Sequence, residues 1–162
     1  MRFRPPAVLL AAALLGAAGC RDAGTGPDTA VEATPFIEAS LSARRVSVGT
    51  PVMVEVLFRN ATSAQLTIGG GPFAQLEVRE EATSRLVARG RFEPLPLVNY
   101  LPRTLAPGET VRDRTPWTGE LTEGATGRAA PGRYLVRVAV TVLGPEERVI
   151  YGAPLTLELV AP

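Results

Sequence analysis

The chain has 162 residues, with 17 basic and 16 acidic side chains, one cysteine and no histidine. This near-balanced charge implies no electrostatically selected partner, and the missing histidine excludes Ser-His-Asp catalysis, Cys-His catalysis and the usual zinc sites. All the basic residues are arginine, which also excludes a P-loop lysine and a Schiff-base lysine.

The first 19 residues predict an export signal. Arg2 and Arg4 precede an apolar run over residues 7–19, and small residues stand directly before Cys20. Residues 17–20 resemble a bacterial lipobox, in which the cysteine carries lipid and begins the mature protein. We therefore predict a lipid anchor on Cys20. An ordinary cleaved signal is the alternative, and so is a membrane helix, although a span needs about 20 apolar residues.

Cleavage at this point divides the chain into a signal peptide (1–19), a lipidated cysteine with a flexible tether (20–35) and one domain (36–162). The tether is small and polar with no hydrophobic periodicity, which predicts disorder. The resemblance to lipoproteins implies the bacterial envelope, facing the periplasm or the surface. Arg21 follows the cysteine, and lipoproteins with aspartate there tend to stay on the inner membrane, so we expect the outer membrane where one exists.

Apolar and polar residues alternate at every second position through much of the domain. Strands are predicted over residues 52–59, 64–68, 74–78, 86–88, 133–142, 149–151 and 155–159, separated by turn residues. Pro154 interrupts the last of these, so we expect a sheet edge or a bulge there. No window outside the signal has a helical period. The pattern predicts an all-β fold, an antiparallel immunoglobulin-like β-sandwich.

The remaining chemical groups predict neither catalysis nor a bound cofactor. Carboxylates suited to glycosidase chemistry stand at predicted turns, where glutamates are usually solvated; these are Glu80, Glu81, Glu120, Glu123, Glu146 and Glu147. No calcium-loop motif occurs, so no metal is expected. The glycines at 69–71 are followed by a strand and predict a turn or bulge, because phosphate-binding loops precede a helix.

Two arginine pairs have the spacing of an outward-facing stripe. Arg112 with Arg114, and Arg133 with Arg137, would share one basic face. We expect neighbouring carboxylates to be their partners, and no nucleic acid, because the chain as a whole is near neutral.

Residues 91–104 are the first candidate for a recognition surface. The segment is apolar but contains Pro94, Pro96 and Pro102, which makes it unsuited to a central strand. Its candidate protein-binding side chains are Phe92, Leu95, Leu97 and Tyr100. The alternative is that they fold back over the open end of the sandwich. Met53 and Leu57, opposite the inward valines, either extend such a patch or lie under this segment.

Trp117, the only tryptophan, has two interpretations. It is either a core residue between the sheets or an exposed stacking platform for a sugar. Large aromatic side chains are mostly buried, which favours the core.

Several short motifs extend over almost all of the domain. They are Val54-x-Val56-x-Phe58-x-Asn60 with Thr62-Ser63, Leu66-x-Ile68 with Gly70, Leu76-x-Val78, the segment 105–109, Trp117 and the segment 131–134. Their order and spacing resemble the BsuPI-like domain, known from an intracellular proteinase inhibitor of bacilli. The resemblance implies an antiparallel β-sandwich and, more loosely, protease binding. Residues 73–76 depart from the family because they lack the acid of its aromatic-Asp-aromatic run, and residues 86–89 lack its tryptophan.

Two functions from different classes remain open. One is a non-catalytic, lipid-anchored module, expected to be monomeric, that binds a protein such as a protease. The other is a structural or carbohydrate-binding envelope module that uses Trp117 or Tyr100. A glycosidase-like enzyme is a remote third option.

Overall fold

The computed structural model describes residues 34–70, 72–91 and 101–162, and within them the chain forms strands and no helix. The strands are β1 (Phe36–Leu41), β2 (Arg45–Ser47), β3 (Val52–Arg59), β4 (Leu66–Ile68), β5 (Ala74–Glu80), β6 (Leu86–Gly90), β7 (Arg103–Leu105), β8 (Thr110–Trp117), β9 (Gly132–Leu143), β10 (Arg148–Tyr151) and β11 (Leu155–Val160). Among these residues, no helix is long and apolar enough to span a membrane.

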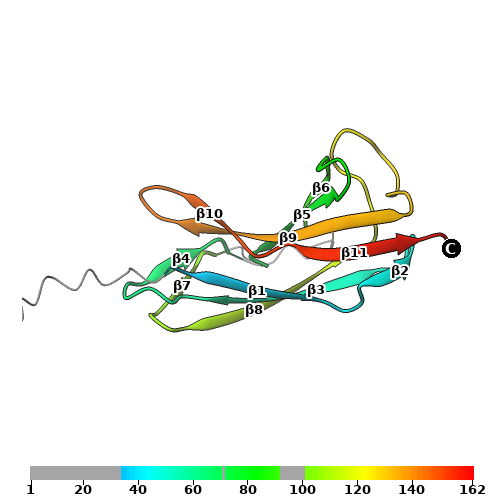
Figure 1. Cartoon of the computed structure of the whole chain (residues 1–162). Helices are drawn as coiled ribbons and strands as arrows, with labels where there is room; N and C mark the ends of the chain where they lie inside the picture. The colour runs from blue at the N-terminus through cyan, green and yellow to red at the C-terminus, as the bar shows by residue number, and fades with distance from the viewer. Residues whose placement is uncertain (1–33, 71, 92–100) are drawn as a thin grey trace, which may run out of the picture. The chain divides into compact units, whose positions relative to one another are not determined.

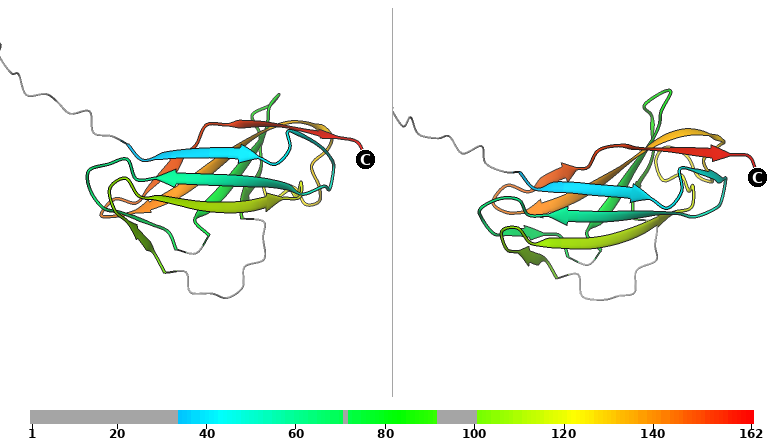
Figure 2. Two further views of the ribbon diagram at one scale, coloured as in Figure 1. Left: turned by 90° about the horizontal axis from the view of Figure 1, so that it is seen from below. Right: turned by 60° about the horizontal axis from the view of Figure 1, so that its bottom comes forward.

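The strands form two layers (Figure 1). The smaller sheet has the order β1-β3-β8, and Figure 2 shows it from its outer side. The larger sheet is built around β9, which pairs with β4 and β5 and also with β10 and β11; β2, β6 and β7 extend this sheet. The described pairings are antiparallel except β2 with β11. The predicted fold class, an immunoglobulin-like β-sandwich, is confirmed.

The core lies between the inner faces of β3 and β9, as the alternation predicts. Val52, Val54, Val56 and Phe58 are buried on β3, and Tyr134, Val136, Val138, Val140 and Val142 are buried on β9. The Tyr134 hydroxyl donates to the Ala130 carbonyl oxygen at 2.7 Å, as in the tyrosine corner of immunoglobulin-like domains. Burial raises the pKa of this phenol.

The interruption at Pro154 is a bulge, one of the two outcomes that the sequence predicts. Tyr151 faces Ala139 on β9, whereas Leu155 faces Val136. Four steps from β10 to β11 therefore match three along β9, so one extra residue lies opposite β9, as in a β-bulge. A proline without a donor is accommodated there because the ladder is already broken.

A buried asparagine joins the end of β3 to the turn between β7 and β8. The Asn60 side-chain amide donates to the carbonyl oxygens of Ala64, Leu105 and Ala106, at 2.8 to 3.1 Å. Its Oδ1 accepts from the backbone and hydroxyl of Thr62. Two of the motifs noted in the sequence, Asn60 with Thr62 and the segment 105–109, therefore meet in one hydrogen-bonded turn.

The predicted signal peptide, Cys20 and most of the tether lie outside the described residues. Of the predicted tether only residues 34 and 35 are described, and Pro35 is already buried directly before β1. The packed part of the chain thus includes one residue that the sequence assigns to the tether.

Candidate functional site

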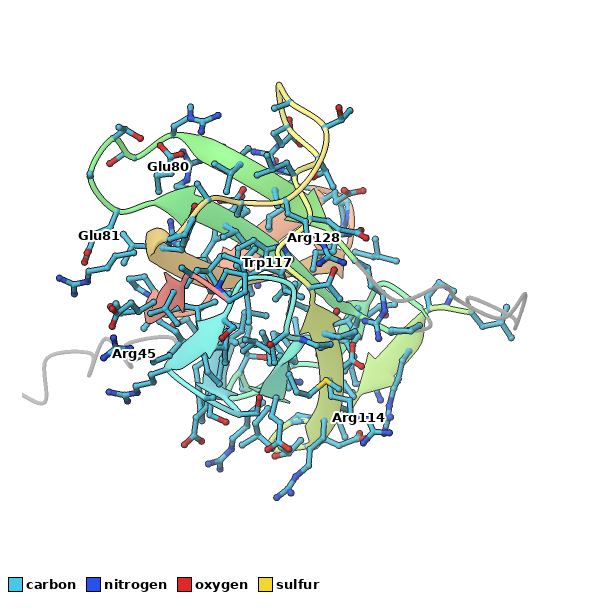
Figure 3. The ribbon with its side chains drawn as sticks, turned by 90° about the vertical axis from the view of Figure 1, so that its right-hand side faces the viewer. Arg45, Glu80, Glu81, Arg114, Trp117 and Arg128 are labelled. Carbon is cyan, nitrogen blue, oxygen red and sulfur yellow. The ribbon has the colours of Figure 1, made fainter. Side chains whose placement is uncertain are left out.

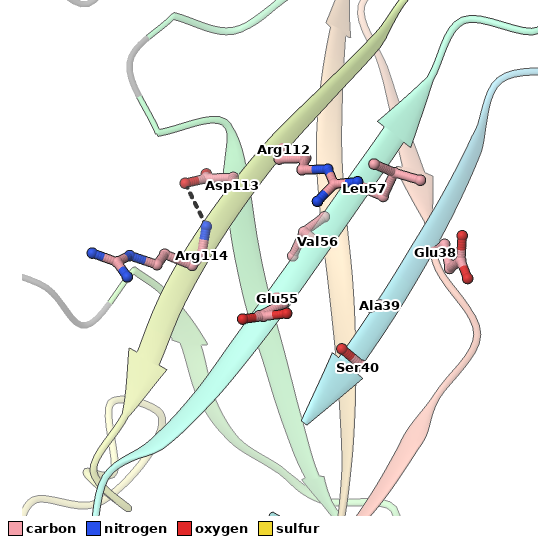
Figure 4. A pocket seen from close by; sticks show the side chains of 9 residues that line it. All are labelled: Glu38, Ala39, Ser40, Glu55, Val56, Leu57, Arg112, Asp113 and Arg114. Atoms are coloured by element: carbon pink, nitrogen blue, oxygen red, sulfur yellow. Dashed lines mark hydrogen bonds between the residues drawn. The ribbon is translucent and has the colours of Figure 1, made fainter. Parts of the chain in front are cut away.

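The outer face of the three-stranded sheet carries a shallow polar depression of about 610 Å³ (Figure 4). The pairing of β3 with β1 and β8 places the side chains of this face in rows that run across the strands. Leu57 of β3 lies between Glu38 of β1 and Arg112 of β8. In the next row, Glu55 lies opposite Arg114. The face therefore has a half-buried apolar centre, with acidic groups on β1 and β3 and basic groups on β8.

The four charged side chains of this face make no ion pair with one another or with other described residues. Glu38, Glu55, Arg112 and Arg114 are all exposed, and each lies beyond 4 Å from any opposite charge in the described part of the chain. Figure 3 shows the Arg114 side chain extending away from β8. Because these charges are exposed, a partner can pair with them without breaking an ion pair among the described residues.

Asp113, between the two arginines, points to the opposite side and joins the two sheets. Its Oδ2 accepts from the Ala74 backbone N–H and from Arg91 Nη1, both at 3.0 Å. Both side chains of this ion pair are nearly buried. The pair therefore fixes β8, and with it Arg112 and Arg114, against the larger sheet.

Trp117 belongs to the core and not to a binding surface. It is 1% exposed, and Figure 3 shows it inside the sandwich. Its ring packs edge-to-face on Tyr134 at 5.8 Å, and its Nε1 donates to the Glu120 carbonyl oxygen. The alternative of an exposed stacking platform is wrong for Trp117, because its one polar atom is satisfied internally and its rings are covered.

The candidate protein-binding loop lies outside the described residues. This applies to Phe92, Leu95, Leu97 and Tyr100, which therefore stay predictions. The described residue on its N-terminal side, Arg91, is held by Asp113 and by the Ala74 carbonyl oxygen. On the C-terminal side, Leu101 is 72% exposed.

Two of the carboxylates at turns, Glu80 and Glu81, are paired with arginines. Glu80 hydrogen-bonds Arg85 and Thr83, and Glu81 pairs with Arg133 at 2.9 Å. The hydrogen bond from Arg85, followed by that from Thr83, lowers the pKa of Glu80. A catalytic acid needs a raised pKa, so this carboxyl is suited to an ion pair and not to proton donation. The described residues contain no group of three side chains placed to hold a metal ion.

The prediction that the two arginine pairs form a single basic stripe is wrong. Arg112 and Arg114 lie on β8 of the smaller sheet, whereas Arg133 and Arg137 lie on β9 of the larger one. Each pair points outward from its own strand, so the two pairs are on opposite faces of the sandwich. Of the four, Arg133 has the carboxylate partner that was expected, Glu81.

No protein-family model and no curated protein matches this chain. Solved structures with a similar fold include a β-glucosidase from Erythrobacter marinus, with 17% identity, a TM-score of 0.48, and coverage of 78% of this chain and 15% of that one. The DNA glycosylase AlkC of Pseudomonas fluorescens, solved with DNA, has 15% identity, a TM-score of 0.50, and coverage of 80% and 31%. A CARDB domain of the PF1109 protein from Pyrococcus furiosus has 17% identity, a TM-score of 0.42, and coverage of 78% and 87%.

The chain thus spans less than a third of the first two proteins. At these identities the likeness concerns the fold alone. Unrelated functions occur on one fold, so the activities of these proteins do not transfer to this chain.

Proposed function

We propose that this chain is a non-catalytic, lipid-anchored envelope module that binds a protein through the outer face of β1, β3 and β8. The observation that carries the proposal is the arrangement on that face. An apolar side chain, Leu57, is flanked by the unpaired charges of Glu38 and Arg112, and Glu55 and Arg114 repeat the pattern one row along. The lipobox-like segment ending at Cys20 supports the anchor.

Charge placement specifies the chemistry of the partner. Its surface presents an apolar side chain to Leu57, basic groups to Glu38 and Glu55, and acidic groups to Arg112 and Arg114. Such complementarity sets orientation and raises the association rate, and salt weakens it. A protease is the partner class that the resemblance to the BsuPI-like domain suggests.

Capture of envelope proteins by the full chain tests this proposal. Arg112→Glu reverses a charge beside the apolar centre of the site, and Arg148→Glu makes the same change at an exposed position of β10, in the other sheet. We expect Arg112→Glu to reduce recovery of the partner at least about tenfold, because like charges then oppose each other across the interface. Arg148→Glu should recover as much as the wild type.

Equal recovery by all three proteins would reject this face as the site. Melting temperatures within about 2 °C of the wild type establish that both variants are folded, since an exposed substitution changes stability little. Leu57→Asp provides an independent test, because it removes the apolar centre without changing either arginine.

A further inference from the structure

A second polar cluster lies on the outer face of the larger sheet, independent of the proposed docking face. Glu77 of β5 is opposite Arg89 of β6 on one side and Arg137 of β9 on the other. The three side chains therefore form one row across three strands. Tyr151 of β10 adds its hydroxyl to the row from the neighbouring strand, 3.3 Å from Glu77 Oε1.

Glu77 is the only carboxylate in contact with this cluster among the described residues. Its side chain is 8% exposed, and Oε1 lies 3.2 Å from Arg89 Nη2. Oε2 lies 3.7 Å from Arg79 Nη2. Arg79 and Arg89 contact this carboxylate and Arg137 lies opposite it in the ladder, so the three arginines together with Glu77 carry a net charge of +2. The chain as a whole is almost neutral, so this excess is local.

Arg137 is held in place by an aromatic ring and not by an acid. Its guanidinium carbon lies 4.6 Å from the centroid of the Tyr151 ring, within the range of a cation–π contact. It has no ion pair within the described residues, and its Nε is buried without a hydrogen-bond partner there. A guanidinium fixed by stacking, with its charge unneutralised, is preorganised to bind an anion.

We propose that this cluster binds a phosphate group. Arginine forks match phosphate oxygens with paired hydrogen bonds, and the excess of two positive charges matches a phosphate dianion. The partly exposed Tyr151, at 43%, forms one side of the site, and Arg89 and Arg137 provide the donors. Glu77 keeps the arginines in their row and is already neutralised by them. The source of the phosphate is either the free ion or a phospholipid headgroup.

Titration of the isotope-labelled full chain in a non-ionic detergent tests this site. Inorganic phosphate is added at constant ionic strength, and the backbone amide resonance of Tyr151 is followed by NMR. We expect a saturable shift in the wild type and in the control Arg148→Gln, and about tenfold weaker binding in Arg137→Gln, since one charge-assisted fork is lost. Tyr151→Leu, at an exposed edge position and followed through the amide of Ile150, should weaken binding in the same direction.

A parallel titration with short-chain phosphatidylglycerol identifies the source. Saturation by the lipid at lower concentration than by phosphate indicates a headgroup site, and the reverse order indicates the free ion. Absence of a saturable shift with either compound would overturn the proposal. So would equal affinity in the wild type and in a folded Arg137→Gln variant.

Discussion

Glu80, at the end of β5, shows how a side chain that the sequence marks as a possible catalytic acid instead stabilises a turn. Arg85 and Thr83 both donate to its carboxylate across the β5–β6 turn. These bonds favour the ionised form and lower the pKa of Glu80 below its ordinary value of 4.5. The same contacts raise the pKa of Arg85.

The lowered pKa predicts a pH dependence of stability with a defined sign. A carboxyl whose pKa is lower in the folded state contributes stability that is complete above about 4.5 and lost as the pH falls through the folded value. Glu80→Gln should therefore melt below the wild type at about pH 7, and the gap should close as the pH falls below about 4.5. Thermal unfolding followed by circular dichroism measures this.

Glu146→Gln is the matched control, because Glu146 is exposed and forms no ion pair in the described part of the chain. Its melting temperature should equal that of the wild type at every pH. A gap for Glu80→Gln that does not change with pH would contradict the ion-pair interpretation.

A strand could be predicted from the sequence when its inward-facing positions hold apolar side chains. Strand β3 has valines and a phenylalanine inside, so its alternation is visible and its predicted bounds agree with the structure. Strand β8 was missed because two of its inward positions carry the polar residues Asp113 and Thr115, and the contact of Asp113 with β5 is not visible in local sequence. Strands β2 and β7 have three residues each and offer too few positions for a period.

In the turn that follows β3, replacing Asn60 should strongly reduce the stability of the fold. Asn60→Ala would leave the buried carbonyl oxygen of Leu105 and the partly buried one of Ala106 without their side-chain donor. We expect a loss of about 3 kcal/mol in the free energy of unfolding, since unsatisfied buried groups cost about 1–3 kcal/mol each. Urea unfolding of the full chain measures it.

Ser63→Ala, at an exposed position of the same turn, should change the free energy of unfolding by less than about 0.5 kcal/mol. A loss for Asn60→Ala no larger than that of this control would show that the hydrogen bonds of Asn60 contribute little.

For the whole molecule, the sequence identified individual members of the candidate site but not their assembly. It placed Met53 and Leu57 opposite the core and Arg112 and Arg114 outward, and the structure has all four on one outer sheet face. Glu38 and Glu55 were not singled out, because a charged side chain on a strand signals only solvent exposure. Strand order brings these residues together, and strand order is not encoded in local periodicity.

If Cys20 carries the lipid anchor, it is the first residue of the mature protein. Mass spectrometry of the chain isolated from bacterial membranes should find Cys20 as the first residue, carrying lipid. An unmodified N-terminus at Arg21 or later would contradict lipid anchoring and leave the docking face unaffected.

Site-specific photo-crosslinking in intact cells tests the central claim most directly. A photoreactive residue is placed at position 57, on the outer face of β3, and in a second full-length protein at position 148, on β10 of the other sheet. We predict one protein adduct from position 57, lost when Arg112→Glu is added, and none from position 148. An equal adduct from both positions, or one from position 148 alone, would contradict the docking face.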